Sequence, residues 1–292
     1  MDIKIVNKIK RLAVIALASD DELIENIVLK GGNAIDLAYS DGCISRTSYD
    51  LDFSIANGDF LGDIDVIKDR IRDTLAKTYK ENGFILIDYE FIIKPKTAKI
   101  GAPDFWGGYL VQFKVVEESV FDKYENDKSM QRRLSIAVKP NNSPKFEIEF
   151  SKFEFIKDKK SINVDGYTVY VYTPEMIVFE KVRAICQQLP QYSDIVKSET
   201  QSARARDFYD IYLIMTTCGV EIESEESIDL LKNIFEAKGV PLEYINEIRS
   251  NKSIHSDDWE NVKATISQVE SPQEFSFYFD YVVNTFEKIT GL

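Results

Sequence analysis

The sequence predicts an α+β protein in which a mixed β-sheet with flanking helices is followed by an α-helical C-terminal domain. Up to residue 173, segments rich in aromatic and β-branched residues alternate with amphipathic segments, which is typical of strands mixed with helices. From Pro174 onward the apolar repeats have only helical spacing. Because 292 residues suffice for two cores, we expect domains at 1–173 and 174–292.

The first domain is expected to begin with helices and to continue with strands. Apolar spacing predicts helices over 2–18 and 21–27, a short apolar segment at 28–30, a helix that opens on Gly31-Gly32, and a helix that ends at Asn82-Gly83. Strands are predicted at 50–55, 84–94, 109–118, 145–155 and 167–173, with a helix at 119–134 and a turn at 141–144. The second domain is predicted to contain helices at 174–188, 203–217, 225–237, 242–250, 256–268 and 274–289.

Charge is distributed unevenly along the chain. The net charge is −13, and residues 219–292 carry 15 acidic against 6 basic side chains. Such a balance disfavours a nucleic-acid partner on global charge. Residues 131–160 carry eight Lys or Arg against four acidic residues. This stretch could form a local basic surface that binds nucleic acid, or it could be an ordinary solvated surface.

Cysteine and histidine usage limits the possible chemistry. Three cysteines far apart and a single histidine, His255, argue against a disulfide framework and against a Cys/His zinc site. We expect His255 to lie in a solvated loop and the protein to be cytoplasmic, in a reducing compartment, because the N-terminal apolar run is too short to span a membrane. Catalysis would then depend on carboxylates, lysines, hydroxyls or backbone amides.

Two aspartates one residue apart, Asp50 and Asp52, form the main candidate site. Side chains at i and i+2 of a strand share a face, and aspartate is depleted in strands. Paired carboxylates beside the backbone amides of Gly31 and Gly32 would suit Mg²⁺ bound to a triphosphate. The alternatives are a solvated strand face and a simple tight turn at the glycines.

Other charged residues are further candidates for this site, although their sequence patterns are less specific. Glu147 and Glu149 share one strand face and could supply a third carboxylate, although a strand with one wet face has the same pattern. Lys181 and the group Arg204, Asp207 and Asp210 lie on predicted helices, where a plain charged face is the alternative.

Taken together, these motifs resemble the AbiEii/AbiGii toxin family, the nucleotidyltransferase-like toxins of abortive-infection, type IV toxin–antitoxin systems. The match to its first motif comprises Gly31, Gly32, Arg46, Ser48, Asp50 and Asp52. The sequence EKVRAI matches the helix that gives Lys181, and RDFYDI matches the helix that gives Asp207 and Asp210. Gln187-Gln188 departs from the pattern, because many family members have an arginine there.

The resemblance implies a polymerase-β-like nucleotidyltransferase domain over 1–173 and a helical domain over 174–292. It also implies that Asp50 and Asp52 hold Mg²⁺ or Mn²⁺ and that Asp207 orients or deprotonates the acceptor hydroxyl. An NTP would be the substrate, tRNA the acceptor, and an antitoxin a partner. The nucleotide-binding residues would be Gly31, Gly32, Arg46, Ser48 and Lys181.

Two other functions stay open at this point. The same chemistry could act on a small-molecule hydroxyl or on a protein side chain, which the acidic C-terminal part suits better than RNA. Alternatively, the chain could be a non-catalytic nucleotide-binding module.

Overall fold

The computed structural model describes residues 1–39, 42–43, 48–95, 103, 105–197, 201–264, 266 and 272–289. The chain forms two compact units, one made of Met1–Asn33, Thr47–Ala98 and Gly107–Val171, the other of Ala34–Arg46, Lys99–Trp106 and Tyr172–Leu292. Each unit is described separately below. Arg46 lies outside the described residues. None of the helices in the described part of the chain has the length and hydrophobicity needed to cross a membrane.

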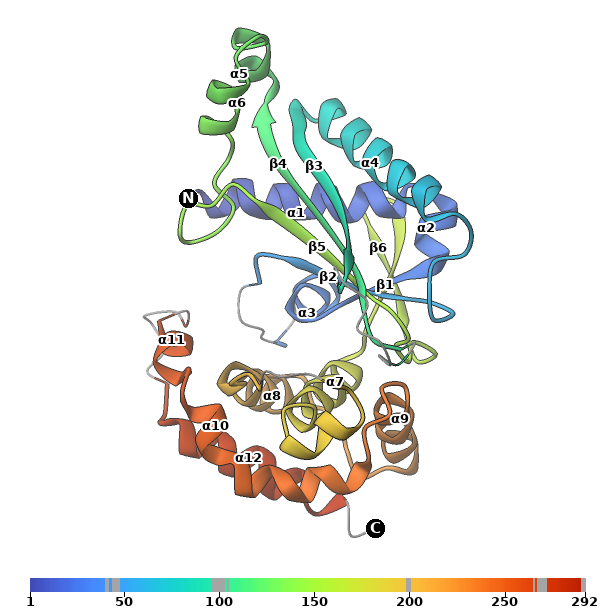
Figure 1. Ribbon diagram of the computed structural model, residues 1–292, viewed down its shortest axis with the longest axis vertical. Coiled ribbons are helices and arrows are strands. Elements are labelled where there is room, and N and C mark those ends of the chain that lie inside the picture. The colour runs from blue at the N-terminus through green and yellow to red at the C-terminus, as the bar shows by residue number, and fades with distance from the viewer. Residues whose placement is uncertain are drawn as a thin grey trace. The chain divides into compact units, whose positions relative to one another are not determined.

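The first unit contains a mixed sheet with the strand order β3-β4-β5-β2-β1-β7-β6 (Figure 1). β2 lies near its centre, antiparallel to β1 and parallel to β5. The strands are β1 Ile27–Lys30, β2 Leu51–Ile55, β3 Phe84–Lys94, β4 Gly108–Glu117, β5 Phe146–Ser151, β6 Lys160–Val164 and β7 Tyr167–Val171. Each predicted strand is present, but Asp50 lies just before β2 rather than within it, and the strand predicted at 145–155 ends at Ser151. β6 is a further strand, and its mostly exposed residues did not indicate it.

The helices of this part of the chain follow the predicted pattern. They are α1 Ile3–Ala18, α2 Asp21–Asn26, α3 Gly32–Ala38, α4 Ile64–Glu81, α5 Glu118–Lys123 and α6 Lys128–Arg133. The Asp63 side chain caps α4 at its start, and α4 ends at Asn82, before Gly83 with φ +79°. α1 packs on α4, where the buried Tyr79 hydroxyl donates to Ile9 O at 2.8 Å.

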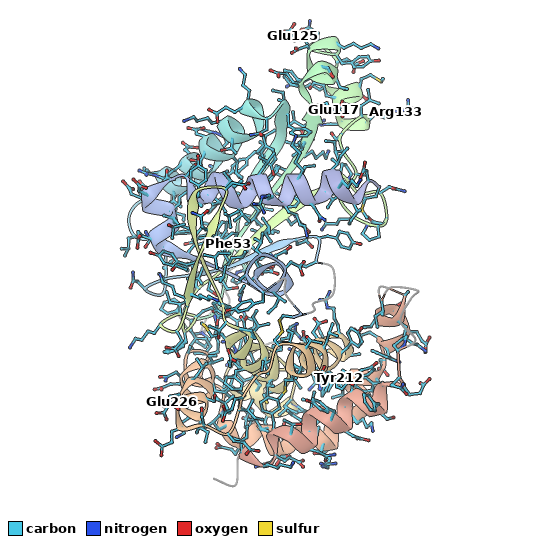
Figure 2. All side chains as sticks on the ribbon, turned by 180° about the vertical axis from the view of Figure 1, so that it is seen from behind. Phe53, Glu117, Glu125, Arg133, Tyr212 and Glu226 are labelled. Atoms are coloured by element: carbon cyan, nitrogen blue, oxygen red, sulfur yellow. A yellow bond between two sulfur atoms is a disulfide. The ribbon has the colours of Figure 1, made fainter. Side chains whose placement is uncertain are left out.

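An aromatic cluster of the first unit's core packs on one face of the sheet. Phe53 stacks on Phe150 with ring centroids 5.6 Å apart, and Phe60 meets Phe150 edge-on (Figure 2 labels Phe53). Since side chains alternate along a strand, burying Phe53 and Phe150 turns Asp52 and Glu149 to the other face.

The second unit contains the C-terminal helices, as predicted. Its elements from residue 172 on are α7 Pro174–Cys186, η1 Pro190–Asp194, α8 Ala205–Thr217, α9 Glu225–Glu236, η2 Leu242–Asn251, α10 Lys252–Ser256, α11 Trp259–Lys263 and α12 Phe275–Phe286. Phe208 of α8 packs against Phe275 and Phe279 of α12. An α+β protein with a mixed sheet followed by helices is thus confirmed.

Three predicted helices differ in detail. The helix expected at 119–134 is split into α5 and α6, because the Asp127 side chain accepts from Met130 N at 3.0 Å and starts a new helix. The segment expected at 242–250 is a 3₁₀ helix, η2. The segment expected at 256–268 instead contains the end of α10 and the short α11.

We expect Thr173→Ala to destabilise the protein by about 1 kcal/mol. Thr173 Oγ1 accepts from Met176 N at 3.3 Å and caps α7, which carries Lys181. Urea unfolding measures the loss. Thr216→Ala is the control, because the Thr216 hydroxyl bonds back to Tyr212 O on an exposed helix surface, and such changes stay within about 0.5 kcal/mol. Equal stabilities of the two variants would contradict the assigned cap.

Candidate active site

β1 ends at Lys30, and the backbone of the next residue, Gly31, approaches Asp52 closely. Gly31 has φ +69°, which favours glycine, and a Cβ built there would lie 3.5 Å from Asp52 Oδ2. Lys30 and Asp52 are register partners in the antiparallel ladder of β1 and β2. A side chain at residue 31 would therefore stand directly beside the Asp52 carboxylate.

The polar face of the sheet carries the predicted carboxylates. Asp52 lies opposite Glu149 in the parallel pairing of β2 with β5. Glu147, two residues before Glu149, lies opposite Gln112 of β4. The alternation predicted from the sequence thus places Asp52, Glu147 and Glu149 on the same face.

A network of partly buried hydrogen bonds holds the segment before β2 in place. Of its polar side chains, Lys10 and Asn33 were not among the residues predicted from the sequence. Lys10 Nζ donates to Asn33 Oδ1 and to Ser48 O, both at 2.9 Å. Asn33 Nδ2 donates to Asp50 O at 2.7 Å, and the Ser48 hydroxyl donates to the same oxygen at 3.2 Å. A lysine within the apolar face of the first predicted helix was the available signal for this network.

Lys139 bridges two of the carboxylates. Its Nζ lies 3.0 Å from Asp50 Oδ1 and also donates to Glu147 Oε2, while Gln112 donates to Glu147 Oε1. In the sequence, Lys139 is recognisable only as part of a basic stretch. Its position beside both carboxylates depends on a loop that returns to the sheet, which sequence spacing does not reveal.

The ionisation of this cluster follows from burial and from Lys139. Burial is the main reason that the pKa of Asp50 is raised, with Glu147 and Glu149 adding to the effect and Lys139 opposing it. Burial also disfavours the charged forms of Lys139 and Glu147, but their mutual pairing outweighs it, raising the pKa of Lys139 and lowering that of Glu147.

These groups fit a hard divalent cation. Carboxylate oxygens are its preferred ligands, and Mg²⁺ often takes only one or two of them, with substrate phosphates and water completing the shell. Asp50 Oδ1 is buried, and its partner among the described residues is the Lys139 ammonium at 3.0 Å, which already places positive charge beside it. Within the same residues, no three His, Cys, Asp or Glu side chains form a ready ligand set.

Glu149 differs from Glu147. Its side chain is half exposed and pairs with Lys94 at 3.6 Å. Glu147 is more buried and is bound to Gln112 and Lys139. Of the two predicted candidates for a third carboxylate, Glu147 is therefore the one that shares a cationic partner with Asp50.

In the second unit, Lys181 is held by both predicted aspartates. Its Nζ donates to Asp207 Oδ1 at 2.8 Å and to Asp210 Oδ2 at 2.9 Å, and Arg204 donates to Asp207 Oδ2 at 3.2 Å. Burial alone would raise the pKa of Asp207, but Lys181 and Arg204 outweigh it and lower that pKa to about 2. Asp207 and Asp210 thus lie on one face of α8, as their i, i+3 spacing predicted.

The structure therefore brings the predicted residues together in two sets. One set contains Asp50, Asp52, Glu147 and Glu149 beside Gly31 and Ser48, and the other contains Lys181, Arg204, Asp207 and Asp210. Each set lies within one unit. Convergence of the two sets on a single nucleotide stays a prediction.

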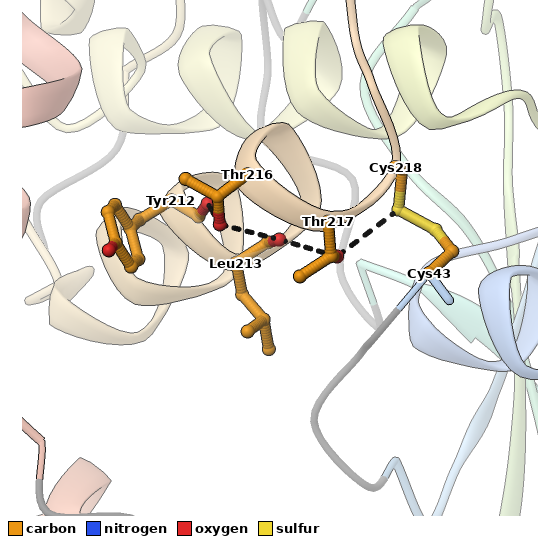
Figure 3. Close-up of a disulfide and its surroundings, with 6 residues drawn as sticks. All are labelled: Cys43, Tyr212, Leu213, Thr216, Thr217 and Cys218. Atoms are coloured by element: carbon orange, nitrogen blue, oxygen red, sulfur yellow. Dashed lines mark hydrogen bonds between the residues drawn. A yellow bond between two sulfur atoms is a disulfide. The ribbon is translucent and has the colours of Figure 1, made fainter.

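Two expectations about cysteine and histidine are wrong. Cys43 and Cys218 form a disulfide with Cα atoms 4.5 Å apart, next to Thr217 at the end of α8 (Figure 3). Spacing could not reveal this pair, because 175 residues separate the two cysteines. His255 is fully buried rather than solvated, its ring 5.2 Å from that of Phe208, and burial lowers its pKa to about 4.

The basic stretch 131–160 is only in part available as a cationic surface. Arg132 pairs with Asp88, Lys152 with Asp59, and Lys139 with the site carboxylates. Lys159 lies over the ring of Tyr170, 3.8 Å from its centroid. Several of its charges are thus committed to partners within the first unit.

A profile of the protein family described as "Nucleotidyl transferase AbiEii toxin, Type IV TA system" matches residues 14–281. None of the curated proteins matches the sequence. Among solved structures, JHP933 from Helicobacter pylori is similar with 20% identity and a TM-score of 0.49, over 98% of this chain and 92% of that one. An antigenic nucleotidyltransferase-like protein from Paracoccidioides brasiliensis is similar with 14% identity and a TM-score of 0.35, over 78% of this chain and 88% of that one.

Proposed function

Because the chain belongs to the AbiEii family of nucleotidyl transferase toxins of type IV toxin–antitoxin systems, we propose that it moves a nucleotide from an NTP to an acceptor hydroxyl on RNA, first of all tRNA. The acceptor oxygen would form a bond to the α-phosphorus as the α–β phosphoanhydride bond breaks, and pyrophosphate would leave. The family makes the protein a nucleotidyltransferase. The observation that carries the proposal is the placement of Asp52 beside Gly31, on the sheet face that also carries Glu147 and Glu149.

In this proposal the first unit binds the metal and the phosphates. Asp50 and Asp52 would hold Mg²⁺ or Mn²⁺, which neutralises triphosphate charge and favours ionisation of the attacking hydroxyl when bound. The backbone of Gly31 and Gly32, with Ser48 and Arg46, would contact the β- and γ-phosphates. Glu147, which shares the partner Lys139 with Asp50, would be the third carboxylate of the site.

The helical part would supply a cation for the same triphosphate. Lys181 suits this task because its ammonium is a compact point charge with three N–H donors. Asp207 and Asp210 hold that ammonium in place. A carboxylate with a pKa of about 2 is a weak proton acceptor at neutral pH, so orientation suits Asp207 better than deprotonation of the acceptor.

The acceptor and the partners are proposed from the resemblance. Related toxins add nucleotides to tRNA 3′ ends, and a type IV system includes an antitoxin.

We propose that the enzyme is cytoplasmic and that its two domains meet in the sequence near residue 173. The Cys43–Cys218 disulfide is unusual for this compartment, since stable disulfides are rare in a reducing cytoplasm.

Transfer of label from an NTP tests the proposal. The purified chain is incubated with each of the four α-³²P-labelled NTPs, Mg²⁺, total RNA and cell protein, and the RNA, protein and small-molecule pools are separated. We expect label in RNA of tRNA size, lost when tRNA is removed and reduced at least tenfold as salt rises from about 50 to about 200 mM. Label in protein, or in a small molecule other than the supplied NTP, would show that the acceptor is not RNA, and label that stays only in the NTP would contradict transferase activity.

A further inference from the structure

We propose that Lys139 occupies the place of a divalent cation at Asp50 and competes with that cation for the site. This inference rests on the proposed function, because it concerns the metal that Asp50 and Asp52 would hold. It adds a residue that neither the family motifs nor the sequence pattern indicated.

The contacts of Lys139 are those expected of a bound cation. Its ammonium bridges Asp50 Oδ1, at 3.0 Å, and Glu147 Oε2. The side chains of Lys139, Asp50 and Glu147 are 21%, 42% and 24% exposed. Since the bridge is partly open to solvent, the ammonium can leave it without unfolding of the sheet.

The backbone around Lys139 is fixed, so that only its side chain has to move. Val138 is fully buried, and both Val138 N and Lys139 N donate to Ser143 O, at 2.9 and 3.2 Å. Asn142 N donates to Lys139 O at 2.9 Å and closes the turn. A four-carbon stem on a fixed turn lets the ammonium swing between the carboxylates and solvent.

Glu147 keeps a second partner when the ammonium leaves. Gln112 Nε2 donates to Glu147 Oε1, and Gln112 Oε1 accepts from Lys145 Nζ at 3.3 Å. Asp50, in contrast, has no other cation among the ion pairs of the described residues. A metal ion arriving at Asp50 therefore has to displace Lys139, because an ammonium and a dication beside the same oxygen repel each other.

Competition predicts that removing the ammonium strengthens metal binding. We expect Lys139→Met to bind Mn²⁺ about threefold to tenfold more tightly than the parent chain in the absence of nucleotide, the range that corresponds to breaking one partly exposed ion pair. Lys139→Arg, which keeps the charge, should bind Mn²⁺ within about twofold of the parent.

The test measures free Mn²⁺ by electron paramagnetic resonance during titration of the full chain, without NTP. Lys114→Met is the matched control, because Lys114 forms an ion pair of similar exposure with Asp88 at 2.8 Å, on a strand of the same sheet. It should leave Mn²⁺ affinity unchanged. Circular dichroism confirms folding of each variant, and Lys139→Gln serves in place of Lys139→Met if that variant does not fold.

Asp52→Asn separates failure of the metal site from failure of the competition. If Asp52→Asn leaves Mn²⁺ binding unchanged, or if no variant binds Mn²⁺, the proposed metal site itself fails. If Asp52→Asn abolishes binding while Lys139→Met binds as the parent does or more weakly, the metal site stands and competition by Lys139 is overturned.

Discussion

Asp52→Asn will reduce the rate of nucleotide transfer about a thousandfold or more, while leaving the protein folded. The amide keeps the shape of the side chain but removes the negative charge that a divalent cation requires, and electrostatic stabilisation of the transferring phosphate supplies much of the rate acceleration in such reactions. Asp52 is only partly buried, at the edge of the core that Leu51 and Phe53 form, so its loss opens no cavity.

Initial rates of label transfer and growth of cells expressing each variant measure the effect. Asp59→Asn is the matched control, because Asp59 is another partly exposed carboxylate of the same unit, paired with Lys152 and bonded to the Tyr109 hydroxyl. We expect cells that express the parent chain or Asp59→Asn to stop growing and cells that express Asp52→Asn to grow. Growth arrest by all three, or by none, would tell against catalytic toxicity.

The position of Asp52 could be predicted because it depends on local rules. Strand alternation places Asp52 opposite the buried Leu51 and Phe53, and it places Glu147 and Glu149 together in the same way. Helix α4 was equally predictable, since its apolar period, its cap Asp63 and its end at Asn82-Gly83 all lie in one stretch of sequence. The i, i+3 spacing of Asp207 and Asp210 likewise indicated a shared face before any partner was known.

The remaining contacts could not be predicted, because they join segments far apart in the chain. Lys139 reaches Asp50 across 89 positions of sequence, and Cys43 meets Cys218 across 175. His255 has polar neighbours in sequence, yet it is fully buried and packs against the ring of Phe208 of α8. Such contacts follow from the tertiary packing, which spacing and composition do not encode directly.

Lys181→Met will reduce transfer at least about a hundredfold and will also destabilise the protein by about 3–5 kcal/mol. The side chains of Lys181, Asp207 and Asp210 are 18%, 9% and 13% exposed. Removing the ammonium leaves two nearly buried carboxylates next to each other. Asp207 then still pairs with Arg204, but Asp210 loses the cation that Lys181 supplied. Loss of activity in this variant therefore has two possible causes, catalytic and structural.

The double variant Lys181→Met, Asp210→Asn separates these causes. Neutralising Asp210 removes the carboxylate that has lost its cation, and Asp207 keeps Arg204 at 3.2 Å, so most of the lost stability should return. Urea unfolding measures that recovery, and Lys232→Met, which breaks the exposed pair with Asp229, is the control with little effect on stability or transfer.

Activity should not recover in the double variant, because the cation proposed to face the triphosphate is still missing. Recovery of transfer together with stability would show that Lys181 serves only to hold α7 against α8.

The pH dependence of stability gives a further check: the folded-state pKa of Asp207, about 2, lies below its ordinary 3.8. The stability that Asp207 contributes is therefore complete above that ordinary value and is lost as pH falls through about 2. In Lys181→Met the pKa of Asp207 should rise, so that this loss begins at higher pH.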